Sequence, residues 1–267
     1  MWWALTGDRR LLEAHDGAVS AALSHLERFG STTRTRCDGG RLHPDSNGLT
    51  IATFRQTTSR ADDPQLHTHA VISAKVQTAE GRWLALDARY LKRHQRMLGG
   101  LYQSVLRAEL IDRFGVEWGP IVNGQAEIAG VPDELVDVFS KRSAAISVAM
   151  VTKLDEFRRR AGREPSRFER AALEREASAD TRSRKSGHGA ADLTTRWHTE
   201  AAQVGWTVEQ LNEAIEQAAG DRWPAAVMTV GGVVEAVSAR WSSRGRPDVI
   251  QAICDGQRPV SPMSGRR

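Results

Sequence analysis

Two histidines separated by a single residue are the part of this sequence best suited to chemistry. His67 and His69 lie in a stretch from Leu66 to Val76 that is apolar and β-branched, as strands are. Because side chains alternate across a strand, both imidazoles are expected to project from the same face. Two imidazoles on one face are half of a divalent metal site. A third ligand must come from a neighbouring strand, and Gln56 is the nearest candidate with an oxygen donor.

The elements that must position these residues are two strands joined by a polar turn. Residues 51–57 are β-branched and aromatic, and residues 59–64 contain the Ser, Asp and Pro that are typical of turns. The pattern therefore predicts a β-hairpin with both histidines on its second strand. A His-x-His pair alone is weak evidence for a metal, because paired histidines also occur in protein cores and on surfaces. The spacing alone leaves these interpretations open.

The composition is that of an ordinary globular protein with a mild positive charge. Of the 267 residues, 40% are hydrophobic and 26% are charged, and the net charge of +4 is compatible with a polyanionic partner. No run of 18 apolar residues occurs, so no membrane span is predicted. The two cysteines, Cys37 and Cys254, are far apart in the sequence, which indicates a reducing cytoplasm rather than a disulfide framework.

Helical patterns dominate outside the hairpin. Apolar spacing predicts a helix over residues 11–29, and Asp87 is expected to cap one long helix that ends near Phe114. Further helices are predicted from Asp133 onwards, and Trp83 is expected in the core. The predicted fold class is α+β, with an antiparallel sheet that carries the metal ligands, flanking helices, and a helical C-terminal segment.

The sequence around the histidines resembles a family signature over a longer stretch. Residues 58–71, Thr-Ser-Arg-Ala-Asp-Asp-Pro-Gln-Leu-His-Thr-His-Ala-Val, are similar to the metal-binding signature of the MobF-type (TrwC/TraI) conjugative relaxases. These proteins belong to the HUH endonuclease superfamily, which nicks single-stranded DNA. The resemblance covers about the first 200 residues and continues through four further motifs, Trp83–Asp87, Gly100–Tyr102, Gly130–Pro132 and Phe139–Arg142.

The resemblance implies a reaction, a cofactor and partners. Members of this family nick plasmid-origin DNA through a phosphotyrosine, and a divalent metal holds the phosphate oxygens. The implied cofactor is Mg, Mn or Zn, and the implied partners are single-stranded DNA at a plasmid transfer origin and other relaxosome or conjugation proteins. Gln56 stands where many members have the first of three histidines, so it is expected to be a ligand beside His67 and His69. The alternative is a strand glutamine that hydrogen-bonds to a neighbour.

Contacts to DNA are expected from basic residues near the predicted sheet. A single-strand site needs a cationic groove, and the candidates are Arg60, Arg55, Lys75 and Arg36. Arg60 has the best support because it lies inside the family signature. The alternative for the other three is an ordinary charged surface.

A departure from the family pattern bears on activity. The family has nucleophilic tyrosines and a following Asp near its N-terminus, and no residues of this sequence match them. Tyr90 and Tyr102 lie on the predicted long helix, where packing is the expected role of both. We therefore expect a relaxase domain truncated at its N-terminus, with no catalytic residues of its own, that does not nick DNA alone. The alternative is a non-catalytic remnant that binds single-stranded DNA or a partner relaxase.

Domain limits follow from the same resemblance. Residues 1–206 are expected to form the relaxase domain without its first strand and nucleophile segment. Residues 207–256 are expected to be a helical segment leading towards a helicase domain that this chain lacks, and 257–267 a disordered tail. No G-x-x-x-x-G-K-[ST] loop occurs, so no ATP site is predicted. A third hypothesis, an unrelated hydrolase or oxygenase with a two-histidine metal site, does not account for the extended signature.

Overall fold

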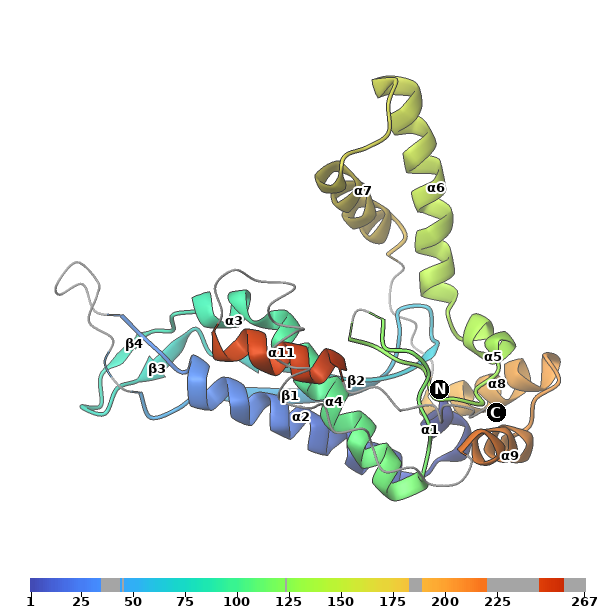
Figure 1. The fold of residues 1–267 in the computed structure, drawn as a ribbon, viewed down its shortest axis with the longest axis horizontal. Helices are drawn as coiled ribbons and strands as arrows, with labels where there is room; N and C mark the ends of the chain where they lie inside the picture. The colour runs from blue at the N-terminus through green and yellow to red at the C-terminus, as the bar shows by residue number, and fades with distance from the viewer. Residues whose placement is uncertain (35–43, 45, 123, 183–188, 220–244, 257–267) are drawn as a thin grey trace, which may run out of the picture. The chain divides into compact units, whose positions relative to one another are not determined.

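A computed structural model describes the chain except for residues 35–43, 45, 123, 183–188, 220–244 and 257–267. The predicted α+β class is confirmed, because small antiparallel sheets stand among many helices (Figure 1). By their internal contacts, residues 1–7, 56–67 and 131–211 form one unit, and the rest of the chain a second unit. Among the described helices, none has the length and hydropathy needed to cross a bilayer. The predicted DNA contact Arg36 and the expected tail 257–267 lie outside the described residues.

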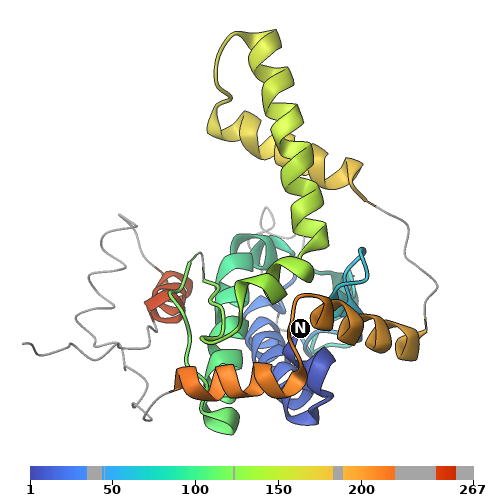
Figure 2. The same ribbon diagram turned by 90° about the vertical axis from the view of Figure 1, so that its right-hand side faces the viewer.

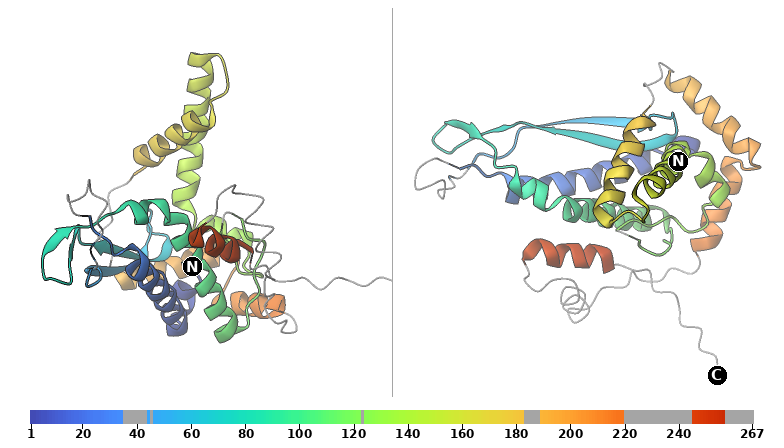
Figure 3. Two further views of the ribbon diagram at one scale, coloured as in Figure 1. Left: turned by 60° about the vertical axis from the view of Figure 1, so that its left-hand side comes forward. Right: turned by 90° about the horizontal axis from the view of Figure 1, so that it is seen from above.

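The second unit is built on the predicted N-terminal helix, α2 (Arg9–Gly30). Asp8 caps it by accepting a hydrogen bond from the Arg10 backbone N–H at 2.8 Å. Buried side chains of α2 pack against α4 (Gln95–Phe114), and α4 also contacts α11 (Arg246–Gly256). The three helices therefore lie side by side with α4 in the middle (Figure 3).

The long helix expected to start at Asp87 is two helices. α3 spans Arg89–Arg93 and α4 starts at Gln95, with His94 between them at a φ of −112°. Asp87 is not an N-cap residue, because Ala88 holds that position before α3. The prediction of one helix is wrong because apolar residues continue at helical spacing through the break, so the periodicity gives no sign of it.

The named strands form two sheets, and each sheet pairs two strands that are consecutive in the chain. β1 (Ile51–Thr58) pairs with β2 (Pro64–Ile72), and β3 (Lys75–Gln77) pairs with β4 (Trp83–Ala85). The hairpin of β1 and β2 is the one predicted. The single strand expected from Leu66 to Val76 is wrong, because the chain leaves β2 at Ser73 and its hydroxyl accepts a hydrogen bond from the Lys75 N–H at 3.1 Å.

The β3–β4 sheet has one buried and one exposed face. Val76 is 1% exposed and is paired with Leu84, whereas Trp83 is 55% exposed. The expectation of a core position for Trp83 is therefore wrong. Its neighbour Leu84 takes the inward position, and alternation along the strand turns the indole outwards.

The first unit is mostly helical. Its helices are α1 (Trp2–Thr6), α5 (Asp133–Val138), α6 (Lys141–Ala161), α7 (Arg167–Asp180) and α8 (Ala190–Gln203). α6 and α7 form a helical hairpin (Figure 2), and α1 and α5 both contact α8. The boundary between the units falls within α9 (Val208–Ala219).

Candidate functional site

The two faces of the β1–β2 hairpin have different surroundings. Thr53 and Arg55 on β1 and Thr68 on β2 line a groove of about 530 Å³ against α2. On the helix side the groove is lined by residues that include Val19 and Leu23. Because successive strand residues point to opposite faces, the residues next to the groove-lining ones point away from α2.

The three predicted metal ligands occupy these outward-pointing positions. Gln56 directly follows Arg55, and His67 and His69 stand on either side of Thr68. His69 is exposed, whereas Gln56 and His67 are half-buried. Because side chains alternate along a strand, all three are expected on the outer face of the hairpin.

One ring nitrogen of His67 is already committed to the backbone. His67 Nδ1 lies 3.0 Å from the Gln65 carbonyl oxygen, which can only accept a hydrogen bond. Nδ1 therefore carries the proton, and in the neutral ring the lone pair is on Nε2. A carbonyl that fixes the tautomer in this way is the usual partner of a histidine metal ligand.

No three His, Cys, Asp or Glu side chains gather into a metal-binding group within the part of the chain that the structure describes. The predicted set of two imidazoles and one amide is a different set of donors. It stays a prediction, with its three members on one face of one hairpin.

The turn between β1 and β2 has an unusual backbone. Asp62 has a φ of 63°, a left-handed conformation that residues other than glycine rarely adopt. The Ser59 N–H donates to the Asp63 carbonyl at 2.9 Å. The Ser59 hydroxyl oxygen accepts from the N–H groups of Ala61 at 3.1 Å and Asp63 at 3.2 Å. Serine and aspartate therefore shape the turn as the sequence pattern predicts.

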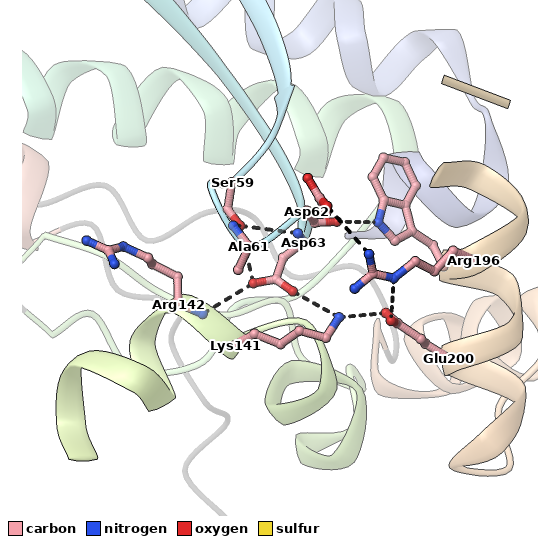
Figure 4. A network of polar contacts seen from close by, with 9 residues as sticks. Ser59, Ala61, Asp62, Asp63, Lys141, Arg142, Arg196 and Glu200 are labelled. Carbon is pink, nitrogen blue, oxygen red and sulfur yellow. Dashed lines mark hydrogen bonds and ion pairs between the residues drawn. The ribbon is translucent and has the colours of Figure 1, made fainter. Parts of the chain in front are cut away.

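Asp63 is the buried centre of a polar network around this turn (Figure 4). The residue is only 2% exposed. Its Oδ2 accepts hydrogen bonds from the Ser59 hydroxyl at 3.3 Å and the Arg142 backbone N–H at 3.4 Å. Its Oδ1 lies 3.2 Å from Lys141 Nζ, an ion pair without hydrogen-bond geometry. The start of α6 thereby neutralises a carboxylate that would be costly to bury alone.

Side chains of helix α8 also contact this turn. Trp197 Nε1 donates to the Asp62 carbonyl at 2.7 Å, and an Arg196 guanidinium nitrogen lies 3.5 Å from the Asp62 carboxylate. Glu200 bridges the helices, accepting from Lys141 Nζ at 2.7 Å and from Arg196 Nε at 2.8 Å. Burial acts to raise the pKa of Glu200, but the hydrogen bonds from these two cations outweigh it and hold the pKa below its usual range.

The sequence pattern did not predict this network. Its acidic half, Asp62 and Asp63, lies inside the signature around the histidines, and Lys141 lies inside a second motif of the resemblance. A signal was therefore present, in the joint occurrence of an acidic turn and a basic helix start. Nothing in the spacing indicates that the two meet.

The four predicted DNA contacts have different settings. Arg60 is half-buried within the turn, and Lys75 is exposed on β3. Arg55 lies on the groove side of β1 and forms an ion pair with Asp16 of α2 at 2.7 Å. Arg36 lies outside the described residues.

Both tyrosines of the sequence have histidine partners. The Tyr102 hydroxyl lies 2.8 Å from His15 Nδ1, and His15 Nε2 lies 2.8 Å from the Thr68 hydroxyl. Burial raises the pKa of Tyr102 to about 12. The Tyr90 hydroxyl lies 3.4 Å from His25 Nε2, and burial also raises the pKa of Tyr90.

Comparison with known proteins connects this arrangement to a family. The TrwC relaxase family model matches residues 1–204. The multifunctional conjugation protein TraI of Escherichia coli is 36% identical over 156 residues, and TraI of Escherichia coli strain K12 is 30% identical over 259 residues. These alignments cover 55% and 93% of this chain but only 8% and 13% of the relatives' own lengths.

Solved structures of the conjugative relaxase TrwC share the fold. A metal-bound TrwC structure in complex with oriT DNA matches with a TM-score of 0.62 and 28% identity, covering 77% of this chain and 68% of that one. A TrwC structure with a 27-mer DNA comprising the recognition hairpin and the cleavage site matches with the same TM-score and identity, covering 77% and 70%. A metal-free TrwC–oriT structure matches with a TM-score of 0.62.

Proposed function

This chain belongs to the TrwC relaxase family, and we propose that it binds single-stranded DNA of a plasmid transfer origin and holds a divalent metal on the outer face of the β1–β2 hairpin. The observation that carries the proposal is the alternation around the groove. It supports a common face for Gln56, His67 and His69, pointing away from the groove-lining side chains of Thr53, Arg55 and Thr68.

The donor set fits a divalent cation. His67 offers Nε2, because Nδ1 is committed to the Gln65 carbonyl, and Gln56 offers a neutral carbonyl oxygen. An oxygen in place of a third imidazole shifts the preference towards Mg or Mn, while two imidazoles also suit Zn. When bound, such a metal supplies Lewis-acid stabilisation to phosphate oxygens of the DNA.

Basic residues of the β1–β2 hairpin and of β3 are the proposed contacts to DNA. Arg60, held in the turn beside buried Asp63, is the first candidate for a phosphate contact, and exposed Lys75 is the second. Arg55 is a weaker candidate because Asp16 already neutralises it. The support from relatives is that solved TrwC structures contain oriT DNA.

We further propose that this chain alone binds DNA without cutting it. The sequence has two tyrosines. The Tyr102 hydroxyl contacts His15 on the α2 side of the hairpin, and the Tyr90 hydroxyl contacts His25. Neither tyrosine therefore lies on the outer face with the proposed ligands. Cleavage would require a nucleophile from another polypeptide segment. We also propose a cytoplasmic location and relaxosome proteins as further partners. The domain limits of 1–206, 207–256 and 257–267 stay part of the proposal.

The substitution Gln56→His tests the metal site. If Gln56 is a ligand, an imidazole at its position should bind Zn²⁺, which imidazole suits better than an amide oxygen does, about tenfold more tightly in a calorimetric titration. Gln77→His, which places the same group on a strand of the other sheet, is the matched control and should leave the affinity unchanged. Equal affinities of the wild type and the Gln56→His chain would show that the position is not a ligand.

A suicide substrate tests the second part of the proposal. Single-stranded oligonucleotides that tile the DNA flanking the coding sequence, each with a bridging phosphorothiolate, would trap any phosphotyrosine as a covalent adduct. We expect binding by fluorescence anisotropy and no adduct. An adduct mapped to Tyr90 or Tyr102 would contradict the proposal.

A further inference from the structure

Trp83 lies on the outer face of the β3–β4 sheet, where it is 55% exposed. It is paired with Gln77, and the next pair on the same face is Ala85 with Lys75. The opposite face carries Val76, which is 1% exposed. An indole turned to solvent, on a sheet whose other face already supplies the packing, has no evident role in the core.

The backbone beneath this indole is fixed on both edges of the sheet. The β3–β4 pairing continues through the Leu86 N–H, which donates to the Ala74 carbonyl at 2.9 Å. The Asn47 N–H donates to the Gln77 carbonyl at 2.9 Å, and the Thr33 hydroxyl donates to the Ala85 carbonyl at 2.7 Å. Trp83 is therefore presented on a rigid strand, which lowers the entropy lost when a ligand binds to it.

A cation accompanies the indole on the same face. Lys75 is exposed and lies diagonally across the two strands from Trp83, and diagonal neighbours are about 7–8 Å apart. The small side chain of Ala85, next to Trp83 on its face, leaves room beside the ring. A flat apolar ring and an ammonium group at this separation match the base and the phosphate of one nucleotide.

The end of β4 adds positive charge. The Asp87 carboxylate, whose side chain is 6% exposed, is shared by Arg34 at 3.2 Å and Arg89 at 2.6 Å. Two guanidinium groups on one carboxylate leave one positive charge in excess, on side chains that are 47% and 64% exposed. The charge around the sheet therefore favours an anionic ligand.

We propose that Trp83 and Lys75 form a stacking site for one nucleotide of single-stranded DNA, with the nucleobase on the indole and the phosphate at the ammonium group. The site rests on the proposed function and adds to it a contact away from the metal hairpin. Because every base has a π-face, the contact is tolerant of sequence and selective for unpaired over paired bases.

The test compares three substitutions at one position by fluorescence anisotropy with a labelled single-stranded oligonucleotide of mixed sequence. Trp83→Ala and Trp83→Leu should both weaken binding by about 5- to 100-fold, as expected for the loss of one stacked base. Trp83→Phe keeps a ring and should stay within about threefold of the wild type. Val122→Ala, which shortens an exposed apolar side chain elsewhere, should leave binding unchanged.

The outcomes separate this inference from the proposed function. If the wild-type chain binds DNA and the Trp83→Ala and Trp83→Leu chains bind it equally well, the stacking site is wrong and the proposed function is unaffected. No binding by the wild-type chain would overturn both. Photocrosslinking to DNA that contains iododeoxyuridine gives a second readout, which does not depend on comparing variant folds. The wild-type adduct is expected on the peptide that contains Trp83, and an adduct only elsewhere would contradict the proposal.

Discussion

The turn of the β1–β2 hairpin is held by distant charged residues, whereas the turn of the β3–β4 hairpin is held by its own backbone. In the first, Asp63 is 2% exposed and meets Lys141 from α6. In the second, residues 79–81 are all exposed, and the Gly81 N–H donates to the Thr78 carbonyl at 2.9 Å. The first turn therefore has contacts from residues far away in the sequence in addition to its own local hydrogen bonds, whereas local hydrogen bonds close the second.

The difference indicates that the backbone geometry of the β1–β2 hairpin is more tightly determined than that of the β3–β4 hairpin. A locally closed turn needs only a suitable glycine, such as Gly81 with its φ of 82°. The β1–β2 turn instead holds Asp62 in a left-handed conformation with contacts from two helices, and strain of this kind persists where the surroundings determine the geometry. The strands leaving that turn carry the proposed metal ligands. Rigid support of this kind keeps ligands in place.

Removing the buried carboxylate should have the largest effect. Asp63→Ala leaves Ser59 and the Arg142 N–H without their acceptor, and should lower the free energy of unfolding in urea by about 2–4 kcal/mol. Asp63→Asn keeps an oxygen acceptor and should cost less. Equal and small losses in both chains would mean that the turn does not depend on this charge.

A glycine substitution probes the locally closed turn. Gly81→Ala places a side chain on a residue with φ 82°, where the added Cβ meets no atom within 4 Å, so only backbone strain remains. The expected loss of unfolding free energy is about 1 kcal/mol. The matched control is Gly99→Ala in α4, which also has open space and should be neutral or stabilising. The two turns would not differ as described if Gly81→Ala cost as much as Asp63→Ala.

Acid should weaken the charge-held turn through Glu200. Its pKa in the folded chain lies below the usual value, so the unfolded chain binds more protons as the pH falls through the range between the two. The stability that Glu200 contributes is therefore present above its unfolded pKa of about 4.3 and is lost as the pH falls below that value. Urea unfolding from pH 6 to pH 3 should show a steeper decline for the wild type than for Glu200→Gln. Parallel curves would contradict this role.

The smallest effect is expected on the groove side of β1. The Arg55–Asp16 ion pair joins side chains that are 44% and 56% exposed, so Arg55→Gln should change the free energy of unfolding by about 0.5 kcal/mol or less. Added salt should remove the difference. A loss of more than about 1 kcal/mol that persists in high salt would show that the pair does more than an ordinary surface contact.

Local patterns predicted the parts of the fold that have local causes. The helix α2, the β1–β2 hairpin and the stop of α4 at Gly115 agree with the structure, because periodicity, turn chemistry and a left-handed glycine determine them. The break at His94 and the division of the second strand at Ser73 were not predicted. Apolar residues continue through both places, so the periodicity gives no sign of either.

For the candidate site, the sequence provided the proposed ligands, which stay a prediction, but not their surroundings. Strand alternation placed His67 and His69 on one face from their spacing, and the family resemblance added Gln56. The network around Asp63 could not be predicted, because Lys141 meets Asp63 across 78 positions of the sequence (141 − 63), and Glu200 joins the network through Lys141 and Arg196. Trp83 was misplaced because aromatic residues are more often buried than exposed.

The central claim is that one divalent ion binds the outer face of the β1–β2 hairpin through two imidazoles. Nitrogen hyperfine couplings of Mn²⁺ bound to the wild-type chain test it most directly, in parallel with His67→Ala and His69→Ala. We expect couplings from two imidazole nitrogens in the wild type and from one in each variant. Bound Mn²⁺ without nitrogen coupling, or with the same spectrum in all three chains, would contradict the account.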